Sequence, residues 1–238
     1  MQEHRLSMKP QELPFVRDMF DRIAPYYDFL NRLLSLRQDV YWRRVLVNNL
    51  SVRPGGVLLD VACGTGDVAL EIARRRVPHT TSIGVDFAPQ MLRRALPKTK
   101  GTRVRLAAAD AFHLPFPAAS FDAITIAFGI RNIQDKPTAL QQFYHHLKPG
   151  GTLAILELVT PEKSAIRRAY LFYFNRLLPL LGRFFSKHHY AYSYLPASVA
   201  QFPPSAQFCA AMRAAGFKGV RYRTLTMGIA ALFVGQKG

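Results

Sequence analysis

This 238-residue sequence has few cysteines, few long apolar runs and few acidic residues in its last third. Its two cysteines, Cys63 and Cys209, are too few for a disulfide framework, and neither stands in a paired spacing typical of metal sites. We therefore expect a reduced protein with no metal site. The longest stretch without a charged residue, from His188 to Met212, is broken by prolines and histidines, so we do not expect a membrane span. The N-terminus has no apolar segment of the kind that directs export, which predicts a cytoplasmic location.

The few acids leave a strongly basic chain with a formal net charge of +17. Residues 161–238 hold 11 Lys and Arg against the single acid Glu162. Such an excess suggests a polyanionic partner or an anionic membrane surface. A solvated basic face without any partner would give the same composition.

Apolar runs that alternate with helical patterns predict an α/β fold with a doubly wound, mostly parallel sheet. We expect strands at 57–61, 82–86, 104–109, 121–128 and 152–158, and helices at 67–76, 89–96 and 137–147. Four parts follow: an N-terminal helical appendage (1–50), a cofactor-binding core (51–160), a helical and aromatic lid insertion (161–204), and a C-terminal helix and hairpin (205–238). Within the lid, residues 187–204 look irregular. The final hairpin should add an antiparallel strand and complete a seven-stranded sheet.

The segment "VACGTGD" predicts a glycine turn between a strand and a helix. The spacing Gly64-x-Gly66-x-x-Ala69, followed by Asp86 after the next strand, matches the dinucleotide fingerprint and keeps a nicotinamide dehydrogenase open. However, Asp67 would stand at the helix N-terminus, where a pyrophosphate would otherwise bind. A carboxylate there would repel phosphate by roughly 4 kcal/mol at about 4 Å. The acidic turn therefore favours a cationic cofactor without phosphate, S-adenosylmethionine.

Acids at successive strand ends agree with an adenosyl cofactor. Asp60 adds a second carboxylate beside the turn, and Asp86 can accept both ribose hydroxyls. Asp110 can accept from the adenine amine while the Ala111 N–H donates to the ring. Helix capping by Asp67 and loop fixation by Asp60 are the alternative interpretations.

The sequence resembles the ubiquinone/menaquinone biosynthesis C-methyltransferases over nearly its whole length. "LDVACGTGD" is general among methyltransferases, whereas "FDRIAPYYD", "FGIRN" and "YLPASVAQFP" are more specific to this family. The resemblance implies a Rossmann-like class I S-adenosylmethionine-dependent methyltransferase fold. It also implies that Thr65, Asp86, Asp110 and Ala111 line the cofactor site, together with the turn residues Gly64 and Gly66. Ala127 departs from the Ser that relatives often carry, so a hydroxyl contact is missing there.

The reaction implied by the resemblance is methylation of a ring carbon on a prenylated quinol, either demethylmenaquinol or a related benzoquinol. Arg131 can stabilise the developing oxyanion, Asn132 can orient a water that acts as base, and Tyr27 can close over the quinol. A salt bridge to Asp135 or another acid is the alternative for Arg131, and ordinary packing is the alternative for Tyr27.

The segment 165–178 has Arg167, Arg168 and Arg176 largely opposite Leu171 and Phe172, a pattern that suits a membrane surface. This predicts peripheral contact with the inner face of the membrane. Packing on the domain or in a homodimer would give the same pattern. An RNA methyltransferase and a non-enzymatic membrane-binding or scaffold protein remain as rivals, although the chain lacks the [DN]-P-P-[YFW] motif and any Pro-Cys pair, so we expect no nucleic-acid partner.

Overall fold

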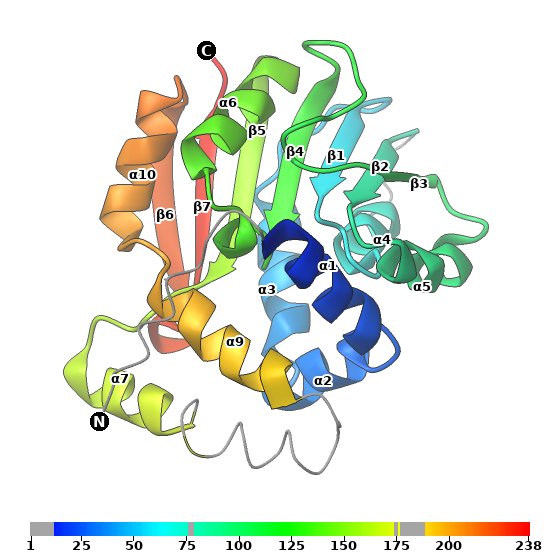
Figure 1. The fold of residues 1–238 in the computed structure, drawn as a ribbon. Helices are drawn as coiled ribbons and strands as arrows, with labels where there is room; N and C mark the ends of the chain where they lie inside the picture. Colours follow the sequence, from blue (N-terminus) through cyan, green and yellow to red (C-terminus); the bar gives the residue numbers. More distant parts are fainter. Residues whose placement is uncertain (1–11, 76–78, 174–175, 177–188) are drawn as a thin grey trace.

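The computed structural model describes residues 12–75, 79–173, 176 and 189–238 of the chain (Figure 1). Its seven-stranded sheet consists of β1 (Val57–Val61), β2 (Thr81–Asp86), β3 (Val104–Ala108), β4 (Phe121–Ala127), β5 (Leu147–Leu158), β6 (Lys218–Leu225) and β7 (Ala230–Gln236). The strand order is β3-β2-β1-β4-β5-β7-β6. Strands β1 to β5 pair in parallel, and β7 is antiparallel to both β5 and β6. The predicted fold class is confirmed.

Helices cover both faces of this sheet and one of its edges. They are α1 (Glu12–Ile23), α2 (Tyr27–Leu34), α3 (Gln38–Asn48), α4 (Asp67–Arg74), α5 (Pro89–Thr99), α6 (Lys136–His146), α7 (Ser164–Phe172), α9 (His189–Ala200) and α10 (Ser205–Ala214), with short 3₁₀ turns η1 (Ile130–Asn132) and η3 (Thr226–Gly228). Figure 1 shows α1, α2 and α9 beyond the carboxyl ends of β1 and β4. Ligands of open α/β sheets bind at that edge.

Alternating side chains on the central strands build two cores. Leu58 of β1 packs with residues of α3 and α4, whereas the next residue, Leu59, packs on the other face with residues of α6 and α10. Both leucines are fully buried. Consecutive strand residues point to opposite faces, so a strand with helices on both sides is apolar at neighbouring positions, as Leu58 and Leu59 are.

Two segments differ from the sequence-based expectation. The "KPGG" segment, expected as a turn, is part of β5, which begins at Leu147 and pairs with Phe121 across a register shift. Residues 189–200, expected to be irregular, form α9 in spite of Pro196. Tyr194, Ser198 and Val199 of α9 are buried at helical spacing, so tertiary packing overrides the local proline signal.

Candidate active site

A glycine turn joins β1 to α4 at the carboxyl edge of the sheet. Gly64 and Gly66 have φ values of 55° and 82°, a left-handed region that side chains with a Cβ atom disfavour. A Cβ at Gly66 would also lie 3.3 Å from the Cβ of Ala95 on α5. The two glycines therefore let the chain reverse tightly while α5 packs against the turn.

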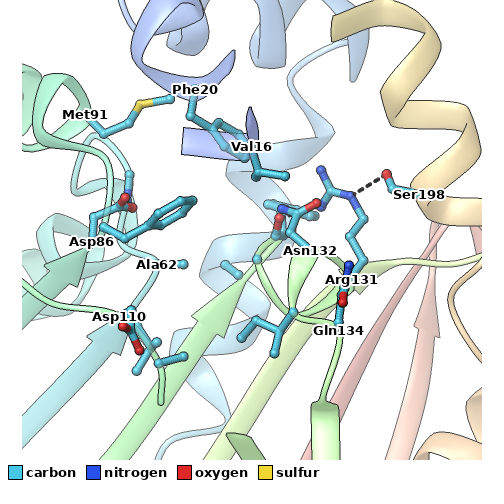
Figure 2. Close-up of a pocket in the computed structure, with 18 of the residues that line it drawn as sticks. Val16, Phe20, Ala62, Asp86, Met91, Asp110, Arg131, Asn132, Gln134 and Ser198 are labelled. Atoms are coloured by element: carbon cyan, nitrogen blue, oxygen red, sulfur yellow. Dashed lines mark hydrogen bonds between the residues drawn. The ribbon is translucent and has the colours of Figure 1, made fainter. Parts of the chain in front are cut away.

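A cavity of about 460 Å³ lies in front of this turn (Figure 2). The loops after β1, β2, β3 and β4 form its floor, and α1, α2 and α9 form its roof. The lining includes Val16, Phe20, Tyr27, Ala62, Gly64, Asp86, Phe87, Met91, Asp110, Ala111, Phe112, Arg131, Asn132, Gln134, Lys136, Tyr194, Ser198 and Gln201. In Figure 2 the acids Asp86 and Asp110 lie on one side, and Arg131 and Asn132 lie on the other.

Asp86 is fixed at the end of β2 by two backbone donors. Its Oδ2 accepts from the Gly64 N–H at 2.7 Å, and its Oδ1 accepts from the Ala88 N–H at 2.8 Å. Burial raises the pKa of the Asp86 carboxyl to about 6, against these two hydrogen bonds, which lower it. The carboxylate keeps acceptor capacity on its cavity side, because each oxygen can accept more than one hydrogen bond.

Asp110 and Ala111 lie after β3 and also line the cavity. The Asp110 Oδ1 accepts from the backbone N–H groups of Phe112 and His113, at 2.7 and 3.0 Å. Asp110 therefore fixes the turn after β3, and its second oxygen, Oδ2, lies 3.2 Å from Nδ1 of the His113 ring.

Asp60 lies behind the glycine turn, in a separate space of about 20 Å³ that Tyr27 and Gly64 also line. Its Oδ1 accepts from the Thr125 hydroxyl at 2.8 Å. Within the described part of the chain its buried Oδ2 has no hydrogen-bond partner. Burial raises the pKa of Asp60 to about 7. An acceptor buried without a donor is costly, and a space of this size has room for one water molecule or one N–H group beside this oxygen.

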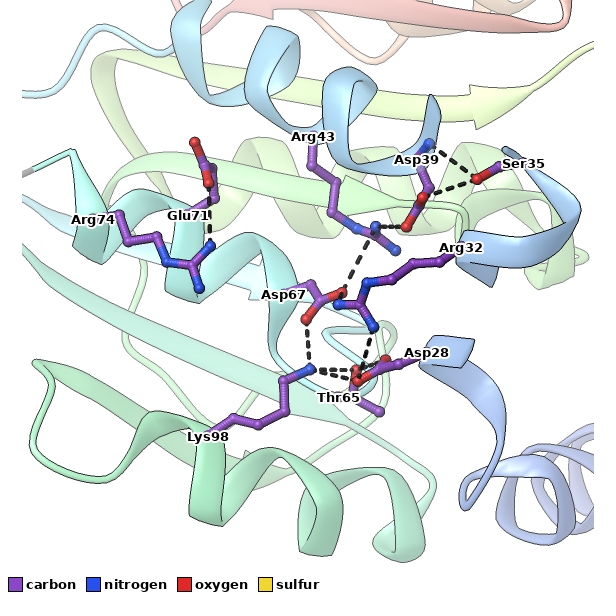
Figure 3. Close-up of polar contacts among 10 residues, drawn as sticks. All are labelled: Asp28, Arg32, Ser35, Asp39, Arg43, Thr65, Asp67, Glu71, Arg74 and Lys98. Carbon is purple, nitrogen blue, oxygen red and sulfur yellow. Dashed lines mark hydrogen bonds and ion pairs between the residues drawn. The ribbon is translucent and has the colours of Figure 1, made fainter. Parts of the chain in front are cut away.

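Thr65 and Asp67 face away from the main cavity, toward the N-terminal helices (Figure 3). The Asp67 carboxylate meets Lys98 at 2.5 Å, Arg32 at 3.3 Å and Arg43 at 3.7 Å. The Thr65 hydroxyl donates to Asp28 at 2.5 Å. Burial would raise the pKa of Asp67, but Arg43, Lys98 and Arg32 lower it below its usual value. The positive charge that Asp67 was expected to receive from a cofactor comes instead from Arg32, Arg43 and Lys98.

Arg131, in η1 after β4, forms a buried ion pair with Glu157 of β5. Its Nη1 donates to Glu157 Oε1 at 2.8 Å and to the Phe128 carbonyl, and its backbone N–H donates to Glu157 Oε2 at 3.1 Å. Asp135 instead caps α6 by accepting from the Thr138 N–H. Arg131 therefore forms the salt bridge that was the alternative interpretation, with Glu157 and not Asp135 as its partner. The same side chain also lines the cavity.

Asn132 and Tyr27 line the same cavity. The Asn132 Oδ1 accepts from the Tyr194 hydroxyl at 3.0 Å. The Tyr27 ring lies 3.8 Å from the position a Cβ would take at Gly64, and it meets the Phe20 ring edge-on. Burial raises the pKa of the Tyr27 phenol, so it is a hydrogen-bond donor and not a base near neutral pH.

Sequence reasoning missed Glu157, Tyr194 and Ser198. Glu157 carried a signal, because it is the single charge in the apolar run "TLAILEL", where a buried acid needs a cationic partner. Tyr194 and Ser198 carried none once their segment was expected to be irregular. Gly66 supports the turn by packing against α5, whereas Gly64, Asp86, Asp110 and Ala111 reach the main cavity.

Comparison with known proteins places this arrangement among methyltransferases. Residues 6–237 match the model of the ubiE/COQ5 methyltransferase family. The chain is 46% identical over 239 residues to the ubiquinone/menaquinone biosynthesis C-methyltransferase UbiE of Geobacter sulfurreducens, covering 99% of this chain and 92% of that protein. It is 48% identical to the demethylmenaquinone methyltransferase of Thermus thermophilus, covering 92% of this chain and 100% of that protein.

Solved structures share the fold at much lower identity. An S-adenosylmethionine-dependent methyltransferase of Thermotoga maritima is 19% identical, with a TM-score of 0.67 over 93% of this chain and 99% of that chain. The [4+2]-cyclase SpnF is 18% identical, with a TM-score of 0.68 over 93% of this chain and 94% of that chain. Because one of these neighbours is named a cyclase, the structural likeness speaks for the fold and not for the reaction.

Proposed function

The chain belongs to the ubiE/COQ5 methyltransferase family, and on that premise we propose that its cavity methylates a ring carbon of a prenylated quinol with S-adenosylmethionine as the methyl donor. It is a methyltransferase, and its curated relatives are named for ubiquinone and menaquinone biosynthesis. This membership decides against the dehydrogenase interpretation of the glycine turn. The observation that carries the finer proposal is the division of one cavity between the acids Asp86 and Asp110 and the donors Arg131 and Asn132.

The acidic side fits S-adenosylmethionine. Asp86 would hold the ribose hydroxyls, and Asp110 with the Ala111 N–H would hold the adenine. Asp60 lies behind Gly64 in its own small space, so it would reach the positive amino-acid end of the cofactor through a single N–H group or a water. Asp67 and Thr65 are left out of direct contact, because their side chains are engaged with Lys98 and Asp28. When bound, S-adenosylmethionine supplies an electrophilic methyl group on a sulfonium.

The opposite side fits a quinol that would lose its hydroxyl proton to a water oriented by Asn132. The phenolate that forms puts electron density on the ortho carbon, which makes the new carbon–carbon bond as the carbon–sulfur bond breaks. A water at the same place would then take the ring proton from that carbon, and aromaticity returns. Arg131 stabilises the phenolate oxygen as a hydrogen-bond donor. It is not the base: burial would lower the pKa of its guanidinium, but Glu157 raises it above the usual value.

Methyl transfer with labelled cofactor tests this function. We expect transfer to demethylmenaquinol or to the corresponding benzoquinol, with none to RNA. Labelling of RNA and of neither quinol would replace the proposal with its RNA rival. The basic composition is the only feature that favours RNA.

We also propose that the protein meets an anionic lipid surface through α2 and α7. Among the described residues no helix is long and apolar enough to span a bilayer. Leu36, two residues after the end of α2, is 82% exposed, and Phe172 at the end of α7 is 60% exposed. Arg167 and Arg168 are exposed on α7, one turn before Phe172. The Tyr173 hydroxyl donates to the Leu34 carbonyl at 2.9 Å, which joins the two elements into one face. In the predicted amphipathic segment, Phe174, Asn175 and Leu178 lie outside the described residues, as does Arg183 just after it, which the helical pattern places with the arginines.

Sedimentation with vesicles tests this surface. We expect binding to vesicles that contain phosphatidylglycerol, weak binding to pure phosphatidylcholine, and a loss of binding in the double variant Leu36→Ser, Phe172→Ser. Leu96→Ser is the matched control, because Leu96 is 58% exposed on α5, away from this face. Equal loss in the control, or wild-type binding by the double variant, would contradict the assignment.

A further inference from the structure

Helix α9 touches both proposed catalytic side chains from one of its faces. The Tyr194 hydroxyl donates to Asn132 Oδ1 at 3.0 Å. Arg131 Nε donates to Ser198 Oγ at 3.2 Å (Figure 2). Tyr194 and Ser198 are 6% and 4% exposed. Because they stand four residues apart, they lie on one side of the helix, one turn from each other.

These two contacts decide which groups the catalytic side chains offer to the cavity. The Ser198 hydroxyl donates its own proton to the Leu195 carbonyl at 2.9 Å, so its lone pairs are left for Arg131. The Arg131 Nε and Nη1 are then both used, and the two N–H groups of Nη2 remain for substrate. For Asn132, the hydrogen bond from the Tyr194 hydroxyl fixes the position of Oδ1 and so directs both the amide NH₂ and the second lone pair of Oδ1 that substrate or water would meet.

The helix that makes these contacts is itself held by the other parts of the cavity roof. Tyr194 packs with Val16 and Met19 of α1. Val199, the residue after Ser198, packs with Leu30 of α2 and Tyr170 of α7. The position of α9 therefore depends on its packing against α1 and α2 in the cavity roof and against α7 beside it.

We propose that Tyr194 and Ser198 are positioning residues, through which docking of α9 sets the orientation of Asn132 and Arg131. This inference rests on the proposed quinol methylation, and it adds that the roof helix α9 is part of the catalytic geometry. When α9 is docked, the hydrogen-bond donors of Arg131 and Asn132 are aligned and water is excluded from the cavity. In such a space each hydrogen bond to a developing charge is stronger.

Steady-state kinetics of Tyr194→Phe and Ser198→Ala test the proposal. Each variant removes one hydroxyl and keeps the packing volume nearly unchanged. We expect kcat for the quinol to fall roughly tenfold in each, the effect of losing one orienting hydrogen bond. The Kd for S-adenosylmethionine should stay at the wild-type value, because neither hydroxyl borders the acidic side. Ser198→Thr restores a hydroxyl and should recover most of the kcat that Ser198→Ala loses.

The control is Ala197→Ser, which adds a hydroxyl on the exposed face of the same helix and should leave both kcat and Kd unchanged. Thermal melting of every variant reports whether it is folded. Folded Tyr194→Phe and Ser198→Ala variants with wild-type kcat would overturn the positioning role while leaving the proposed function standing. Failure of the wild type to methylate either quinol would instead overturn the proposed function.

Discussion

The guanidinium of Arg131 and the carboxylate of Glu157 form an ion pair at 2.8 Å whose side chains are only 8% and 0% exposed. Glu157 also accepts from the Leu158 N–H at 2.8 Å, so both of its oxygens are hydrogen-bonded. The pair ties the turn after β4 to the end of β5. It keeps a full positive charge at the cavity wall at a site where an unpaired arginine would be strongly destabilising.

Removing the acid of this pair should destabilise the protein more than removing an exposed ion pair. Glu157→Ala leaves the Arg131 charge buried without a counter-charge, so we expect the free energy of unfolding in urea to fall by about 3–5 kcal/mol. The matched control is Arg53→Ala. Arg53 is 84% exposed and lies 3.5 Å from Asp122, so its loss should cost about 1 kcal/mol or less. Equal losses in the two variants would show that the Arg131–Glu157 pair does not hold the turn.

The amine of Lys98 lies between Asp28 and Asp67, at 2.8 and 2.5 Å, and so connects α2 with the start of α4. In Lys98→Met the two carboxylates lose their shared cation, and α2 loses a link to the glycine turn. We expect faster amide hydrogen exchange in residues 27–34 with no change in the β4 and β5 strands. Arg94→Met, on the exposed side of the same helix, serves as the control and should exchange like the wild type. A Lys98→Met variant with wild-type exchange would exclude the link.

The stability of the ligand-free protein should decrease as the pH rises from about 4 to about 7. Burial raises the pKa of Asp60 from 3.8 to about 7 and that of Asp86 from 3.8 to about 6, so in this range the folded protein binds protons that the unfolded chain has released. The free energy of unfolding then falls with pH, by about 1.4 kcal/mol per pH unit for each such proton. Asp60→Asn should flatten the slope between pH 5 and 7 by nearly that amount. An unchanged slope in urea titrations would mean that Asp60 is ionised throughout.

Much of the fold could be predicted because it depends on local patterns. The run "VLL" at 57–59 is apolar at consecutive positions because β1 is covered on both faces. Gly64 and Gly66 marked the turn because their φ values exclude most other residues. Asp86 and Asp110 could be placed at one edge because parallel strands end there.

The parts that could not be predicted depend on contacts between distant segments. Asp67 looked like a cation-binding acid because nothing local reveals that Lys98, 31 residues later, takes its charge. The helical state of 189–200 depends on packing of Tyr194 against α1, about 175 residues earlier in the sequence. The ion-pair partner of Arg131 could not be predicted for the same reason, because Glu157 comes from the neighbouring strand β5.

The central claim is that Asp86 receives the ribose of S-adenosylmethionine at the mouth of the sheet, and calorimetric titration of the ligand-free protein tests it most directly. We predict that the wild type binds S-adenosylmethionine and not NAD, and that Asp86→Ala weakens this binding by roughly 10- to 100-fold through loss of charge-assisted hydrogen bonds. The control Asp18→Ala, which removes an exposed acid from α1, should bind like the wild type. Wild-type affinity in a folded Asp86→Ala variant, or tighter binding of NAD, would contradict the account.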